Sequence, residues 1–103
     1  MPRDIKKVEK NVEVAAKMLK ALSNERRLLI VCILHMGEKS VGALEEVIGL
    51  SQSALSQHLA RLRRDGIVKT RRDAQTIYYS LNSGEAEQIL ACLHDIYCDE
   101  DAC

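Results

Sequence analysis

The cysteines are the residues of this chain with the most distinctive chemistry. The 103 residues include four of them, Cys32, Cys92, Cys98 and Cys103. A cysteine can attack sulfur as its thiolate, bind a soft metal ion, or remain inert when it is buried. Nothing at the N-terminus resembles a secretion signal, so we expect a reducing, cytoplasmic environment and no static disulfide framework. The four cysteines are therefore buried apolar residues, metal ligands or redox groups.

The positions of the cysteines leave these alternatives open. Cys32 lies in a short apolar run, where a packed thiol is the ordinary outcome. Cys98, Cys103 and His94 could gather round a soft metal ion. Cys92 is about 240° round a helix from Cys98, so the two do not share a face, and we predict that Cys92 packs in the core. No Cys-x-x-Cys motif is present, and we predict that the chain is not an enzyme.

A second set of side chains could bind nucleic acid. In the stretch 51–66, SQSALSQHLARLRRDG, leucines recur at helical spacing, and small, polar and basic residues cover the opposite face. Ser and Gln can hydrogen-bond base edges in the major groove, and Arg can reach bases or phosphates. We therefore predict that this helix contacts DNA through Ser51, Gln52, Ser53, Ser56, Gln57, Arg61 and Arg64.

A helix-turn-helix would position these residues. Residues 40–48 predict a short first helix, and a Gly-Leu-Ser turn follows with Ser51 as N-cap of the second helix. Gly66 is suited to end that second helix. Residues 40–66 are therefore expected to form the helix-turn-helix, and its buried stripe would consist of Leu55, Leu59 and Leu62.

The next stretch, residues 67–81, predicts a β-hairpin. Residues 67–71 and 75–81 are rich in Val, Thr, Ile and Tyr, and the connection 72–74 contains Arg72. A hairpin that directly follows a helix-turn-helix can act as a wing, whose basic tip meets adjacent phosphates or the minor groove. We predict that the wing contacts DNA through Arg71, Arg72 and Gln75.

Amphipathic helices are predicted at both ends, over 6–22 and 84–98, with an acidic tail at 99–103. A central buried helix, capped by Ser23 or Asn24, would lie between the first helix and the helix-turn-helix. The stripe of the first helix could cover its own core, but we favour a dimer seam, because the stripe is narrow and begins well before the rest of the domain. Its members are Ile5, Val8, Val12, Ala15, Leu19 and Leu22.

Length and charge agree with a small DNA-binding domain. The chain has no Trp or Phe, so its single core must be aliphatic, and small aliphatic domains often gain stability by dimerising. The formal net charge is zero, yet residues 51–72 contain six Lys or Arg and one Asp, whereas residues 85–101 contain six acidic and no basic residues. The acidic end should therefore lie away from DNA. No apolar run is long enough to span a bilayer, so we expect no membrane partner.

The predicted order of elements, with LKALSNERRLLIVCIL, LSQSALSQHLARLRRDGIV and TRRDAQTIYYSL, resembles the ArsR/SmtB family of winged-helix repressors. The resemblance covers about residues 12–98. It implies a mainly α winged helix-turn-helix of order ααααββα with a small β-hairpin. It also implies a homodimer built on the first and last helices, which binds an inverted-repeat operator in double-stranded DNA and leaves it when an inducer binds.

The metal sites of other family members have no counterpart in this chain. The segment that carries Cys-Val-Cys in many members is 39–42, Lys-Ser-Val-Gly. A second family site, with two His and two acidic ligands, aligns with Ser83, Glu85, Ile96 and Asp99. One carboxylate pair without imidazole or thiolate partners does not bind zinc tightly. The resemblance therefore implies no metal and no cofactor.

Cys32 in IVCILH and Cys98 in LHDIYC do match a pattern, that of the persulfide-sensing subgroup that includes BigR, SqrR and HlyU. The resemblance implies that a persulfide or polysulfide inducer reacts with these two cysteines and leaves them joined through extra sulfurs or as a disulfide. Acidic neighbours disfavour the Cys98 thiolate, so we hypothesise that Cys32 is the more reactive thiol. Cys103 is interpreted as a bystander, and the alternative inducer is a metal or metalloid bound by the C-terminal thiolates.

Overall fold

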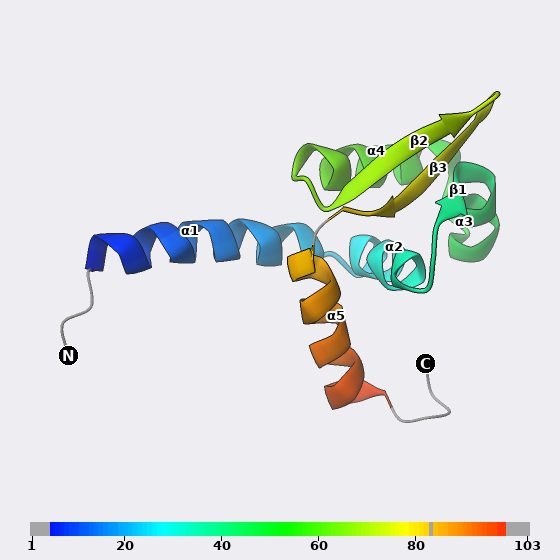
Figure 1. Ribbon diagram of the computed structural model, residues 1–103. Helices are drawn as coiled ribbons and strands as arrows, with labels where there is room; N and C mark the ends of the chain where they lie inside the picture. Colours follow the sequence, from blue (N-terminus) through cyan, green and yellow to red (C-terminus); the bar gives the residue numbers. More distant parts are fainter. Residues whose placement is uncertain (1–4, 83, 99–103) are drawn as a thin grey trace.

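The computed structural model describes residues 5–82 and 84–98. Within them the helices are α1 (Ile5–Leu22), α2 (Glu25–His35), α3 (Val41–Ile48), α4 (Gln52–Arg64) and α5 (Gly84–Tyr97), and the strands are β1 (Lys39–Ser40), β2 (Val68–Asp73) and β3 (Thr76–Leu81). The fold is mainly helical with a small antiparallel sheet, as predicted (Figure 1). No helix in these two ranges is long and apolar enough to cross a membrane.

Helix α2 is the centre of the molecule, because it contacts α1, α3, α4, α5 and β3. Its N-cap is Asn24, whose Oδ1 accepts hydrogen bonds from the backbone N–H groups of Arg26 and Arg27 at 2.9 and 3.1 Å. The prediction of a central helix is confirmed, but this helix is only partly buried, because Leu29 and Cys32 are exposed where α2 faces α5. Its buried residues are Ile30, Val31, Ile33 and Leu34.

Helices α3 and α4 form the helix-turn-helix with capped ends. The Ser40 Oγ accepts a hydrogen bond from the Ala43 N–H at 3.1 Å, and the Ser51 Oγ accepts one from the Ala54 N–H at 3.2 Å. Between them Gly49 ends α3 with a φ of 74°, a conformation that glycine adopts without steric cost. The predicted cap at Ser51 and the predicted turn are confirmed.

Strands β2 and β3 form the wing, and β1 adds a third strand in the order β1-β3-β2. Arg72 and Asp73 belong to β2, so the hairpin turns at Ala74 and Gln75, later than predicted, and Ala74 adopts a positive φ of 56°. The prediction of a two-stranded sheet is incomplete. Strand β1 is only two residues long, too short to show the alternating pattern by which strands are recognised.

Helix α1 reaches the core only at its C-terminal end. Ala21 and Leu22 are buried and Met18 packs against the core, but Ile5, Val8, Val12, Val14 and Leu19 are 44–69% exposed. Figure 1 shows α1 projecting from the rest of the molecule. With α1 included, the molecule measures 53 × 32 × 22 Å. Apart from Leu22, the stripe therefore does not cover a core of its own chain, in agreement with the dimer-seam interpretation. The exposed members of the stripe include Ile5, Val8, Val12 and Leu19.

Candidate DNA-binding surface and cysteine groove

Helix α4 buries one face and exposes the other. Its three predicted core leucines are buried, and this burial sets the rotation of the helix about its axis. The polar and basic side of the helix consequently faces outward, where side chains can reach the edges of bases in a groove. The residues exposed on this side are Ser51, Gln52, Ser53, Ser56, Gln57 and Arg64.

The last turn of α4 is organised by Asp65, whose side chain is almost completely buried. The Arg61 Nε donates a hydrogen bond to Asp65 Oδ2 at 3.0 Å, and the Arg64 Nε lies 3.7 Å from Asp65 Oδ1. Arg61 is half-buried and held along the helix, whereas Arg64 is largely exposed. Of the two predicted contacts, Arg64 is therefore the one better placed to reach a phosphate.

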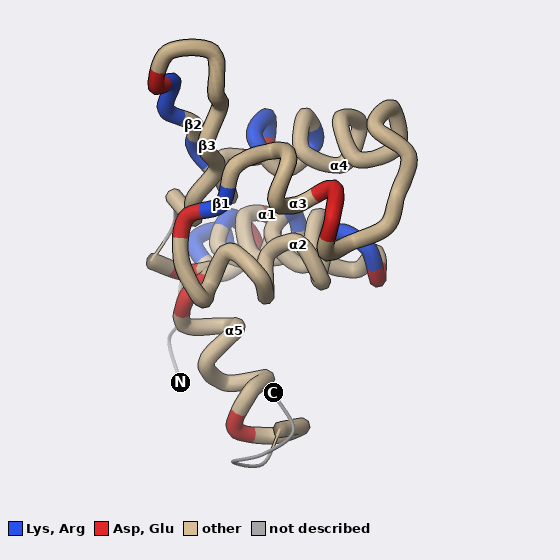
Figure 2. Tube along the Cα trace, turned by 90° about the vertical axis from the view of Figure 1, so that its right-hand side faces the viewer, with Lys and Arg blue, Asp and Glu red and all other residues tan. Residues whose placement is uncertain are grey.

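The wing and α4 together form a concave basic surface. A hollow of about 620 Å³ lies between them, and Ser56, Arg63 and Arg64 of α4 face Ile77 and Tyr79 of β3 across it. Figure 2 shows Lys and Arg along α4 and β2 at one end of the molecule and acidic residues on α5 at the other. A duplex backbone is attracted to such a surface by its positive field.

The three predicted wing contacts lie in different environments. Arg72 and Gln75 are exposed at and beside the turn. Arg71 instead donates hydrogen bonds to Glu38 and lies with its Cζ 4.4 Å from the centroid of the Tyr78 ring. The hydrogen bond from Arg71 holds the pKa of the Glu38 carboxyl below its ordinary value.

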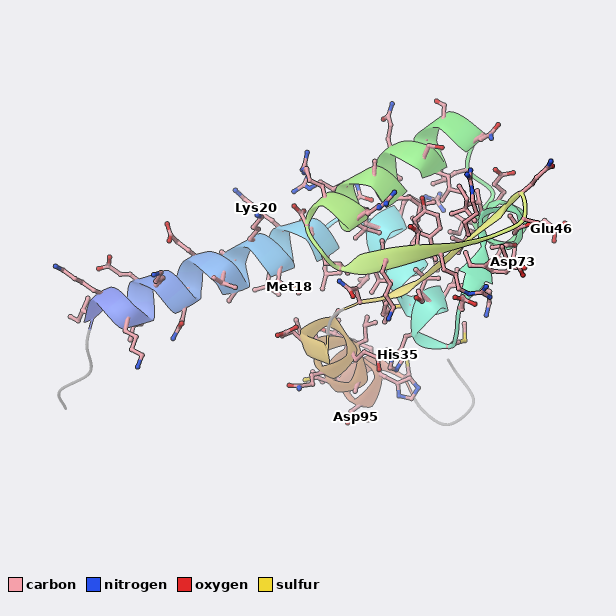
Figure 3. The ribbon with its side chains drawn as sticks, turned by 45° about the horizontal axis from the view of Figure 1, so that its top comes forward. Met18, Lys20, His35, Glu46, Asp73 and Asp95 are labelled. Atoms are coloured by element: carbon pink, nitrogen blue, oxygen red, sulfur yellow. The ribbon has the colours of Figure 1, made fainter. Side chains whose placement is uncertain are left out.

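A mainly apolar groove of about 630 Å³ separates α2 from α5. Cys32 on α2 and Cys98 just after α5 both line it, although they are far apart in the sequence. Figure 3 labels His35 of α2 and Asp95 of α5, and both residues also line the groove. The apolar walls are formed by Leu28, Leu29, Ile33, Met36, Leu90, Ala91, Leu93 and Tyr97.

The two cysteines of the groove differ in redox state. Cys32 is an exposed free thiol, yet the walls partly desolvate its sulfur, and this burial raises the pKa of the Cys32 thiol above its ordinary value. Cys98 is half-buried and disulfide-bonded, and its partner is not Cys32, which is free. Any reaction between this pair therefore starts from protein that has first been reduced.

Cys92 is not in the core, so the prediction made for it is wrong. Helix α5 packs inward through Ala86 and Leu90, and Cys92 projects from the opposite side of the helix as an exposed free thiol. The prediction is wrong because α5 has only one side against the domain, the side of Ala86 and Leu90, and Cys92 does not lie on it. Cys92 does not line the groove.

The alternative metal site cannot be assembled from the described residues. In residues 5–82 and 84–98 there is no group of three His, Cys, Asp or Glu side chains that could hold a metal ion. Cys103 and the rest of the acidic tail 99–103 lie outside these ranges, as does Ser83. Of the positions aligned with the second family site, Glu85 and Ile96 lie near opposite ends of α5.

Comparison with known proteins identifies the family. The model for bacterial regulatory proteins of the arsR family matches residues 24–70. The transcriptional activator HlyU of Vibrio cholerae is 53% identical over 97 residues, which cover 94% of this chain and 90% of that protein. This chain belongs to the ArsR family. The ArsR-family chain is also 45% identical over 94 residues to the biofilm growth-associated repressor of Xylella fastidiosa, covering 91% of this chain and 82% of that repressor.

Solved structures confirm the winged helix-turn-helix fold of this ArsR-family chain. Reduced HlyU from Vibrio cholerae matches with a TM-score of 0.87 and 54% identity, over 90% of this chain and 98% of that one. The repressor BigR from Xylella fastidiosa matches with a TM-score of 0.84 and 43% identity, over 95% and 100%. A homodimeric winged helix-turn-helix domain from Mycobacterium bovis matches with a TM-score of 0.79 and 26% identity, over 98% and 94%. The relatives are transcriptional regulators and not enzymes, as predicted.

Proposed function

We propose that this ArsR-family regulator binds an inverted-repeat operator as a homodimer and releases it when Cys32 and Cys98 are crosslinked by reactive sulfur species. The observation that carries this proposal is the groove that both cysteines line, one from α2 and one from the end of α5. HlyU of Vibrio cholerae is named an activator, whereas the biofilm growth-associated repressor of Xylella fastidiosa, BigR, is named a repressor. We assign repression to this chain, and the proposed chemistry acts on the DNA-binding step.

DNA is bound in this proposal by the outer face of α4 in the major groove, with the wing on the adjacent backbone. The burial of the leucine stripe supports this orientation, since it turns the polar side of α4 outward next to the basic hollow. The proposed contacts are Ser51, Gln52, Ser53, Ser56, Gln57, Arg61, Arg64, Arg72 and Gln75, and Arg71 is considered below.

The proposed homodimer uses α1 and α5. Both helices expose large apolar residues that nothing in the described part of the chain covers, including Ile96 and Tyr97 at 62% and 78% exposure. Exposed apolar surface of this extent is typical of an interaction site. A two-fold dimer also matches an inverted repeat, because the symmetry of the protein mirrors that of the operator.

The proposed reaction needs only thiols and a persulfide. The Cys32 thiolate attacks the terminal sulfane sulfur of the persulfide RSSH, a new S–S bond forms, and the thiol RSH leaves with the proton. Cys98 is converted in the same way. The Cys32 persulfide anion then attacks the Cys98 sulfur, and hydrosulfide leaves with the electron pair. The product is a Cys32–Cys98 trisulfide, and the sulfane sulfur that leaves as hydrosulfide is the group reduced.

The crosslink would change DNA affinity through the helices that it joins. Helix α2 contacts α4, and α5 is one of the two proposed dimer helices, so a bond between α2 and α5 links the recognition helix to the dimer interface. Release requires the crosslink to be less stable in the DNA-bound dimer than in the free dimer, because only a differential effect changes affinity.

Intact-protein mass spectrometry with peptide mapping, combined with operator binding, tests this function. Reduced dimer is treated with glutathione persulfide, glutathione disulfide or peroxide. We expect a Cys32–Cys98 bridge with added sulfur only after the persulfide, and loss of operator binding in the same sample. Cys32→Ser and Cys98→Ser should bind operator but no longer release it.

The matched control is Cys92→Ser, which removes an exposed thiol of α5 that does not line the groove. This variant should respond to persulfide as the unmodified protein does. A Cys32–Cys98 disulfide without added sulfur after every oxidant would show that the protein senses oxidants in general and not persulfides. Unmodified Cys32, together with a metal bound by the purified reduced protein, would favour the metal-responsive alternative.

A further inference from the structure

The two adjacent arginines of the wing lie on opposite faces of the sheet. In the β2–β3 register, Arg72 is opposite Ile77 and Arg71 is opposite Tyr78. Residues directly opposite each other in an antiparallel pair share a face, and neighbours along a strand alternate between faces. Ile77 lines the hollow against α4, so Arg72 shares the face that is turned toward the recognition helix. Arg71 belongs to the other face.

Arg71 is held on that other face by two neighbours. Its Nη2 donates a hydrogen bond to Glu38 Oε1 at 2.8 Å, and its Nε donates one to Glu38 Oε2 at 3.0 Å. This two-point geometry matches the fork of a guanidinium to the two oxygens of a carboxylate. The guanidinium also lies over the Tyr78 ring at 4.4 Å, which adds a cation–π contact. All donors on one edge of the guanidinium are thus directed at Glu38.

The same contact joins the wing to the start of the helix-turn-helix. Glu38 directly precedes β1, and β1 pairs with β3 at only two positions, Lys39 with Tyr79 and Ser40 with Tyr78. Ser40 is also the N-cap of α3. A two-residue ladder is a weak connection by itself, and the Arg71–Glu38 pair adds to it a side-chain contact from β2, across β3, to the residue before β1.

From this geometry we infer that Arg71 is a positioning residue, which fixes the wing against the helix-turn-helix through Glu38 and Tyr78, and that Arg72 is the arginine of the wing that contacts phosphate. The inference rests on the proposed operator binding. It reassigns one of the three predicted wing contacts, Arg71. Neutralising Glu38 should therefore weaken DNA binding, although it removes a negative charge from a DNA-binding domain.

The first test measures operator affinity of the full-length dimer by fluorescence anisotropy as salt rises from about 50 to about 200 mM. Arg72→Ala should reduce the slope of log K against log salt by about 0.9 for each copy in the dimer. Arg71→Ala and Glu38→Gln should each lower affinity roughly two- to fivefold, the range of an exposed ion pair, without changing that slope. Their double variant should lose no more than either single variant.

Arg71→Lys separates the two roles most sharply. It keeps the positive charge but not the fork that engages both carboxylate oxygens. A positioning role predicts that Arg71→Lys loses as much affinity as Arg71→Ala. Affinity retained by Arg71→Lys, a shallower salt slope in Arg71→Ala, or tighter binding by Glu38→Gln would each assign Arg71 to phosphate contact and overturn the inference.

The second test needs no DNA, so it separates this inference from the proposed function. Amide hydrogen exchange at the β1–β3 ladder of the free protein should become roughly two- to fivefold faster in Glu38→Gln and Arg71→Ala, and stay unchanged in Arg72→Ala. Unchanged exchange in the first two variants would refute the positioning role. If the protein bound no inverted-repeat DNA, the proposed function would fail while this measurement still decided the role of Arg71.

Discussion

Cys32 combines two properties that oppose each other at neutral pH. It is exposed to solution at the groove, yet the desolvation that raises its pKa reduces the fraction present as thiolate. The thiolate that does form is a stronger nucleophile, because intrinsic nucleophilicity rises with pKa. The hypothesis that Cys32 is the more reactive of the two thiols stays a prediction, and the raised pKa weighs against a fast reaction at pH 7.

The pH dependence of Cys32 alkylation follows from the same shift. In the reduced folded protein, the iodoacetamide rate at Cys32 should rise with pH and reach its midpoint above that of Cys32 in urea, where no groove desolvates the thiol. Leu29→Ala, which removes part of the groove wall, should move the folded midpoint down toward the unfolded one. Peptide mapping by mass spectrometry follows the rate. A folded midpoint at or below the unfolded one would contradict the prediction.

Single residues were predictable where a local pattern determined them. The N-cap at Ser51 and the exposed face of α4 follow from side chains within a few positions of each other. The Arg71–Glu38 pair joins residues 33 positions apart, so no local sequence pattern predicts it. The exposure of Cys92 likewise depends on which side of α5 meets the domain, and composition cannot show this.

The N-cap of α4 stabilises the helix itself, so its contribution can be measured without DNA. Ser51→Ala removes the oxygen that accepts the Ala54 N–H, so the free energy of unfolding should fall by about 1 kcal/mol. Urea unfolding at one fixed protein concentration measures this change, since a dimer is stabilised by concentration. Ser53→Ala, at an exposed position of the same helix, is the matched control and should change stability by less than about 0.5 kcal/mol. Equal effects of both substitutions would count against the cap.

The elements themselves were predictable to the extent that each has its own periodicity. The five helices and the wing follow from apolar spacing and turn residues, and their observed bounds lie close to the predicted ones. Strand β1 was missed because Lys39 and Ser40 are polar, and they become a strand only by pairing with β3. The angle between the wing and the helix-turn-helix likewise depends on contacts between distant segments.

The proposed DNA-binding surface and the proposed dimer interface lie in different parts of the molecule. The basic concave surface of α4 and the wing lies at one end, and the uncovered apolar residues of α1 and α5 lie away from it (Figures 1 and 2). A dimer formed through α1 and α5 would therefore leave both recognition helices accessible. The cysteine groove lies between these two regions, where α2 faces α5, so a bond formed there can affect both.

The stripe on α1 provides the sharpest test of the homodimer. Val12 lies on the stripe and Val14 on the opposite side of the same helix, and the two are similarly exposed, at 58% and 68%. Burying a valine contributes about 1.5 kcal/mol or more, and each seam residue occurs twice in a two-fold dimer. Val12→Glu should therefore raise the dimer dissociation constant at least about tenfold in sedimentation equilibrium, whereas Val14→Glu should leave it nearly unchanged. Val12→Glu should also weaken binding to an inverted repeat much more than to a single half-site, because the second half-site is lost with the second protomer. Equal weakening by both glutamates would mean that α1 does not use this stripe as its seam.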